Sequence, residues 1–140
     1  MENAKIAYQL GVLFEEKIIS FYRESYKGKF GKSQIEVLDY MYEHSIVRGQ
    51  DISEALNISK QHTSKILLKF QEMGLIDSCA DISDKRAKQF HLTEQGKQYV
   101  ENHITMSNIH FEEMIKKLTE TEQREMVHAM QVMNTLLEKM

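Results

Sequence analysis

Apolar residues recur three or four positions apart over residues 6–21, which is the spacing of one face of an amphipathic helix. The segment Ser33–Glu36 then has the spacing of a capping box, with Ser33 as the N-cap and Glu36 reaching back to it. This predicts a second helix that ends near His44. A short helix is predicted over about residues 51–56, and no proline interrupts the chain.

The next stretch, NISKQHTSKILLKFQEMGLI, begins polar and ends apolar. Ser59 is its predicted N-cap, and Gly74 is a typical helix terminator. A short helix, a tight turn and a second helix form a helix-turn-helix, whose second helix enters the major groove of DNA with its N-terminal residues. The polar start would therefore face DNA. The apolar end would pack on the core through Ile66, Leu67, Phe70 and Met73.

Two extended segments, LIDSC and KQFHLT, flank the polar sequence ADISDKRA and predict an antiparallel hairpin with a basic tip. Thr93 and Thr119 are the predicted N-caps of two further helices, the second through a capping box with Glu122. With 140 residues the chain has room for one substantial core. The predicted fold is mainly α with a small β-hairpin, in which a winged helix-turn-helix is flanked by long N- and C-terminal helices.

Charge is unevenly distributed along the chain, although the net value is only −3. Residues 59–100 carry seven lysines and arginines against five acidic residues, whereas the segments before and after are net negative. The side chains in the positive segment suit DNA. Gln61 can bond two atoms of an adenine edge, and Lys60 and Lys65 suit guanine acceptors or phosphates. An arginine at the hairpin tip fits a narrow minor groove.

Other classes of function have weaker support in the sequence. No glycine-rich phosphate loop or nucleophile elbow is present, so an enzyme is not expected. His103 and His110 would lie about 10.5 Å apart along a helix, too far to share one ion, so neither a metal nor another cofactor is expected. Cys79 is the single cysteine and is interpreted as a packed residue. Redox sensing through Cys79, metal sensing on the same fold and a winged helix without DNA contact remain the alternatives.

The N-terminal sequence lacks a signal peptide, and no stretch reaches the roughly 20 apolar residues of a membrane helix. We therefore expect a cytoplasmic protein with no membrane partner.

The sequences NISKQHTSKILLKFQEMGLIDS and DISDKRAKQFHLTEQGKQ together resemble the MarR (multiple antibiotic resistance regulator) family of bacterial transcription factors. The shared features are the Ser-capped recognition helix, the Gly-Leu-Ile exit, the Asp84-x-Arg86 wing and the closure from Leu92 to Gly96. The resemblance extends over nearly the whole chain, because the flanking helices follow the family's order. One departure is Ser78, which stands where the family often has an arginine.

The resemblance implies a homodimer that binds a pseudo-palindromic operator in double-stranded DNA and acts as a repressor released by a small-molecule effector, whose identity is open. It implies one domain over residues 1–140, with a winged helix-turn-helix at about 33–93 and dimerisation helices at about 2–27 and 94–140. Asp84 would brace the wing. The residues expected at the DNA are Ser59, Lys60, Gln61, His62, Ser64, Lys65, Lys69, Lys85, Arg86 and Lys88.

Overall fold

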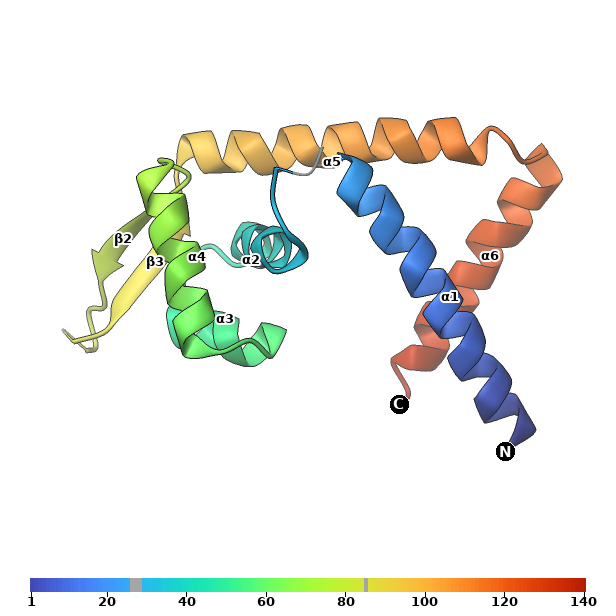
Figure 1. Cartoon of the computed structure of the whole chain (residues 1–140), viewed down its shortest axis with the longest axis horizontal. Helices are drawn as coiled ribbons and strands as arrows, with labels where there is room; N and C mark the ends of the chain where they lie inside the picture. The colour runs from blue at the N-terminus through green and yellow to red at the C-terminus, as the bar shows by residue number, and fades with distance from the viewer. Residues whose placement is uncertain (26–28, 85) are drawn as a thin grey trace.

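The computed structural model describes residues 1–25, 29–84 and 86–140, over which the chain forms six helices and a three-stranded antiparallel sheet (Figure 1). In chain order the elements are α1 (Glu2–Ser25), α2 (Lys32–Glu43), β1 (Val47–Arg48), α3 (Gly49–Leu56), α4 (Lys60–Glu72), β2 (Ile76–Ala80), β3 (Lys88–Leu92), α5 (Glu94–Ile115) and α6 (Glu120–Leu137). The mainly α fold with a hairpin is thereby confirmed.

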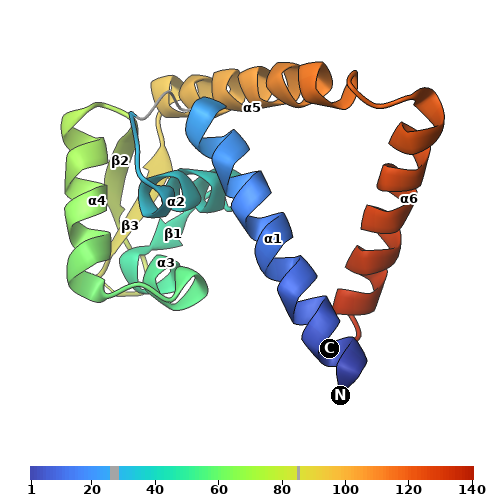
Figure 2. The same cartoon turned by 45° about the vertical axis from the view of Figure 1, so that its right-hand side comes forward.

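Helix α5 forms a long bar to which the other parts attach (Figures 1 and 2). The lobe formed by α2, α3, α4 and the sheet lies at the N-terminal end of α5. Helix α1 runs away from the middle of α5 and α6 from its C-terminal end. Helix α1 still approaches the lobe at α2, where Lys32 Nζ lies 3.6 Å from Glu15 Oε1, whereas α6 stands clear of the lobe.

The buried apolar core lies in the helix-turn-helix lobe and at the start of α5. Its members are Phe30, Ile35, Val37, Leu38, Met41, Val47, Ile52, Ile66, Leu67, Phe70, Leu75, Ile76, Leu92 and Val100. By contrast, no residue of α6 is buried. In the described part of the chain, no helix is both long and apolar enough to cross a membrane.

Three predicted N-caps are confirmed, because each hydroxyl accepts a hydrogen bond from a backbone N–H three residues later. Ser59 accepts from His62 at 3.1 Å. Thr93 accepts from Gly96 at 3.0 Å. Thr119 accepts from Glu122 at 3.3 Å, and the Glu122 carboxylate accepts the Thr119 N–H at 2.8 Å, which completes the predicted capping box.

The predicted cap of the second helix is wrong. The N-cap of α2 is Gly31, and Ser33 lies inside the helix. The backbone N–H of Gly31 donates to Oε1 of Gln34 at 3.1 Å, so Gln34 occupies the third helical position that Glu36 was predicted to fill. The helix starts earlier because this amide satisfies the exposed N–H just before the first turn. Helix α3 likewise begins at Gly49, two residues before its predicted start.

The sheet contains a strand that the sequence pattern does not predict. Its order is β1-β3-β2, with Val47 opposite Phe90 and Ile76 opposite Leu92. Strand β1 spans only two residues, which is too short to show alternation between apolar and polar positions. Because β1 directly precedes α3 and pairs with β3, it joins the hairpin to the start of α3.

Two residues with left-handed backbone set the path into and out of α4. Asn57 ends α3 with φ of 52° and ψ of 47°, and Gly74 follows α4 with φ of 74°. Asparagine and glycine are the residues that adopt this conformation most readily. The turn between α3 and α4 therefore has a defined shape, and Gly74 terminates α4 as predicted.

Candidate nucleic-acid interface

Helix α4 has one buried side and one exposed side. Thr63 is only 1% exposed, and its hydroxyl donates to the backbone carbonyl of Ser59 at 3.0 Å. Together with Ile66, Leu67 and Phe70 it attaches the helix to the core. The opposite side carries the predicted DNA-contact residues of this helix, all exposed: Ser59, Lys60, Gln61, His62, Ser64, Lys65 and Lys69.

Leu68 is an exposed residue of α4 for which the sequence pattern predicts no role at the DNA. It is 56% exposed, and it lies four positions after Ser64 and seven after Gln61, so these residues share one face of the helix. This spacing is visible in the sequence. The sequence alone does not single out Leu68, because the second half of α4 is apolar and Leu68 looks like the neighbouring residues that anchor the helix to the core.

Lys69 differs from the other lysines of α4 in its surroundings. Its Nζ atom lies 5.3 Å from the ring centroid of Phe30, within the range of a cation–π contact. Phe30 in turn packs edge-on against Phe70 and Tyr99, each at 5.5 Å between ring centroids. Lys69 is thus held on the flank of α4, and its predicted contact with DNA stays a prediction.

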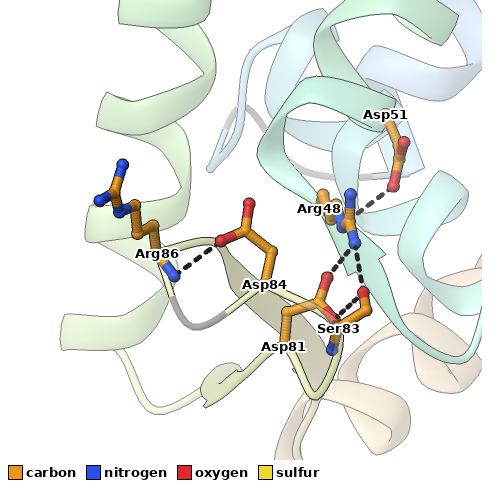
Figure 3. Close-up of polar contacts among 6 residues, drawn as sticks. All are labelled: Arg48, Asp51, Asp81, Ser83, Asp84 and Arg86. Atoms are coloured by element: carbon orange, nitrogen blue, oxygen red, sulfur yellow. Dashed lines mark hydrogen bonds and ion pairs between the residues drawn. The ribbon is translucent and has the colours of Figure 1, made fainter.

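The wing lies between β2 and β3, beside the helix-turn-helix (Figure 1). Arg86 and Lys88 are exposed, whereas the predicted contact residue Lys85 lies outside the described residues. Asp84 Oδ1 accepts the backbone N–H of Arg86 at 3.0 Å (Figure 3). The Asp84 carbonyl accepts the backbone N–H of Ala87 at 3.0 Å. Asp84 therefore folds the tip locally, while its role as the wing's brace stays a prediction.

A second set of contacts at the base of the wing has no counterpart among the sequence predictions, and we call it the wing clamp: Arg48, Asp81 and Ser83 (Figure 3). The Arg48 guanidinium donates to Asp81 Oδ2 and, at 3.3 Å, to Ser83 Oγ. Asp81 Oδ1 accepts the Ser83 hydroxyl at 2.8 Å and the Ser83 backbone N–H at 2.9 Å. No local pattern could have revealed this clamp, because Arg48 and Asp81 are 33 positions apart.

The Asp81 carboxylate is 4% exposed. Hydrogen bonds from the Ser83 hydroxyl and backbone N–H, together with the Arg48 guanidinium, hold the pKa of Asp81 below its usual value. Asp81 is therefore a charged group at neutral pH, and its charge is stabilised by donors from two different segments.

Ser78, the departure from the family pattern, connects the sheet to α4. Its Oγ accepts a hydrogen bond from Nε2 of Gln71 in α4 at 3.2 Å. It contributes no positive charge at this position.

A hollow of about 250 Å³ between α2 and α5 contains two groups with shifted pKa values. Burial raises the pKa of Asp39 to about 6, and the carboxylates of Glu43 and Glu36 act in the same direction. Burial lowers the pKa of His103 to about 4. His103 Nε2 lies 3.2 Å from Ser107 Oγ. This histidine is therefore neutral at neutral pH.

The interpretation of Cys79 as a packed residue is wrong, because Cys79 is exposed on β2. It lines a second hollow, of about 400 Å³, that faces the end of α2 and the start of α5. His91 and Lys97 line the same hollow. Among the described residues, no three histidine, cysteine, aspartate or glutamate side chains gather as metal ligands would. The expectations of no cofactor and of no redox role for Cys79 stay predictions.

Comparison with known protein families identifies the domain to which the helix-turn-helix lobe belongs. Residues 30–96 match the family model of the winged helix DNA-binding domain. The chain carries a winged helix domain. It includes α2, α3, α4 and the sheet, and with them every residue predicted to contact DNA.

Individual relatives extend the likeness beyond the winged helix domain. An uncharacterised HTH-type transcriptional regulator of Bacillus subtilis, YdgJ, is 26% identical over 124 residues, which cover 88% of this chain and 73% of that protein. The crystal structure of MepR, described as a transcription regulator of the Staphylococcus aureus multidrug efflux pump MepA, superposes with a TM-score of 0.76 at 22% identity, covering 91% of this chain and 97% of that one.

A MepR variant bound to an oligodeoxyribonucleotide has a TM-score of 0.68 at 22% identity, covering 94% of this chain and 97% of that one. Together with the winged helix domain, these likenesses confirm the MarR-type fold expected from the sequence. Helices α1 and α6, which lie outside residues 30–96, belong to this wider likeness.

Proposed function

We propose that this protein is a cytoplasmic, homodimeric transcriptional repressor, not an enzyme, that binds a pseudo-palindromic operator through α4 and the wing and is released by a small-molecule effector. The observation that carries the proposal is the exposed polar face at the start of α4, beside a wing with exposed basic residues. The first turns of a recognition helix are the part that meets base edges in the major groove.

The chemistry of the α4 face supports sequence-specific contact. Gln61 offers an amide that can bond adenine N6 and N7 together, and Lys60 and Lys65 can reach guanine acceptors or phosphates. Ser64 is small enough to let the helix approach the bases closely. Leu68, exposed on the same face, suits apolar contact with a thymine methyl group.

The terminal helices support a dimer. Many of their apolar side chains are exposed, namely Ile6, Leu10, Leu13 and Phe14 of α1 and Val127, Val132, Met133, Leu136 and Leu137 of α6. Full burial of an exposed side chain of this kind is worth about 1.5–3 kcal/mol, and because these are about half exposed, a second copy that covers them would gain part of that amount at each. Two-fold symmetry would place two α4 helices on successive turns of one face of DNA.

Release by an effector is supported by the hollows next to the junction of α5 with the winged helix domain. The two described above, of about 250 and 400 Å³, both include residues of α2 and α5. A ligand that prefers one arrangement of α5 relative to the winged helix domain would change the distance between the two α4 helices of a dimer. The related MepR regulates a multidrug efflux pump, which fits control by a small molecule.

Replacing Gln61 by alanine tests the sequence-reading role of α4. We expect the variant to lose its preference at one position of each half-site, at a cost of about 1–3 kcal/mol, because a bidentate amide contact discriminates by that amount. The measurement is the affinity of wild type and variant for an operator series with each base at each position. A loss of the same size on every sequence would show that Gln61 does not read bases.

A further inference from the structure

The wing clamp joins the base of the wing to the residues directly before α3, the helix that packs against α4. We propose that Arg48 is a positioning residue, which holds the base of the wing against the start of α3 and so fixes the placement of Arg86 relative to α4. This role rests on the proposed function, since it concerns how the α4 face and the wing engage one DNA site together.

The backbone at Arg48 is itself anchored. Val47 and Arg48 form β1, which pairs with β3 at Phe90 and Gln89. The Arg48 N–H donates to Asp51 Oδ2 at 2.9 Å, within the first turn of α3 (Figure 3). The guanidinium therefore projects from a fixed point at the entrance to the helix-turn-helix.

The partners of Arg48 lie at the point where the wing leaves the sheet. Asp81 follows β2 directly, and its N–H donates to the carbonyl of Ala87 at 3.2 Å, which closes the base of the wing tip. Asp81 also fixes Ser83 through two hydrogen bonds. The guanidinium thus holds both Asp81 and Ser83, while Arg86 lies beyond them in the tip, where its backbone N–H donates to Asp84 Oδ1.

The clamp has a mechanical consequence. A two-stranded hairpin has little stability by itself, and its tip is the part most free to move. With the clamp, the residues at the base of the tip are tied to α3, which packs against α4. Without it, only the strands would position the tip, and Arg86 would sample a wider range of positions relative to the minor groove.

The Arg48 side chain is 43% exposed, so a direct contact with a phosphate is the competing explanation for any effect of its removal. The two explanations differ in how Arg48 depends on Arg86. A positioning residue acts through Arg86 and loses its effect when Arg86 is absent. A phosphate contact adds the same loss in either background and lowers the salt dependence of binding.

The experiment is a double-mutant cycle with Arg48→Gln and Arg86→Ala in the full-length protein, on a selected operator with A·T or G·C flanks. We expect Arg48→Gln to weaken binding to the A·T-flanked operator about tenfold and to reduce the preference for A·T flanks, with less than about a twofold further loss in the Arg86→Ala background. Arg48→Lys should restore most of the affinity, because an ammonium can still reach Asp81.

Asp81→Asn and Asp77→Asn form a matched pair, because each removes one negative charge near β2 and only the first lies in the clamp. Asp81→Asn should reduce flank preference as Arg48→Gln does, and Asp77→Asn should leave it unchanged. Equal losses from Arg48→Gln in both Arg86 backgrounds, or unchanged affinity and flank preference, would overturn the positioning role alone. Failure of the wild-type protein to bind any sequence specifically would instead overturn the proposed function.

Discussion

Leu137→Glu is expected to convert the protein from a dimer to a monomer and to lower its affinity for a two-half-site operator by at least about 100-fold. Leu137 lies near the end of α6, where it is exposed in the single chain. In a two-fold dimer each substitution occurs twice. Burial of leucine at the interface is favourable, whereas burial of an unpaired carboxylate there costs free energy. A monomer would also lose the gain in affinity from binding two half-sites at once.

Light scattering and operator titration measure the two effects on the same samples. Ser45→Glu is the matched control, since it adds the same charge on an exposed loop residue of the winged helix domain. It should keep the dimer mass. A Leu137→Glu protein that remains a dimer would contradict the assignment of α6 to the interface. A monomer that binds the operator at wild-type affinity would contradict the requirement for two copies.

Gly96→Ala is expected to lower the free energy of unfolding by about 3 kcal/mol, the upper end of the cost of overpacking. A Cβ atom at Gly96 would lie 1.9 Å from the Leu75 carbonyl oxygen and 3.2 Å from Leu92 Cδ2. The Leu75 oxygen is backbone and already accepts the Thr93 N–H at 3.0 Å, so it cannot turn aside. Helix α5 would have to move away from the entrance to β2.

Urea unfolding of wild type and variant at one protein concentration measures this change. Gly49→Ala provides the control, because a Cβ at Gly49 would meet only Leu67 Cδ1 at an ordinary 3.6 Å. That substitution should change stability little. If both variants were as stable as the wild type, the result would contradict the close packing of Gly96 in α5 against the backbone of Leu75.

The parts of the fold that the sequence predicts correctly are those set by interactions between near neighbours. Ser59, Thr93 and Thr119 each cap a helix through an N–H three residues away, so the signal and its cause lie within one turn. The burial of one side of α4 follows from helical periodicity in the same way. The same periodicity is enough to predict that the candidate DNA-contact residues of α4 lie on its exposed side.

The features that the sequence does not predict depend on contacts between distant segments. Strand β1 exists because Val47 and Arg48 meet β3, which lies far along the chain beyond the helix-turn-helix. The wing clamp likewise requires the hairpin to pack beside β1, because only then does Arg48 contact Asp81. The start of α2 is a local feature that the pattern also misses, because two overlapping caps compete there, Ser33 with Glu36 and Gly31 with Gln34, and the helix adopts the second.

The most direct test of the central claim is selection of DNA fragments by the purified wild-type protein. Genomic fragments are mixed with the protein, bound fragments are sequenced, and the mass of the complex on the recovered site is measured. The account predicts one enriched pseudo-palindrome, with half-sites about one helical turn apart and two copies of the chain bound. Recovery of fragments without a shared sequence, or of a site bound by a single copy, would contradict it.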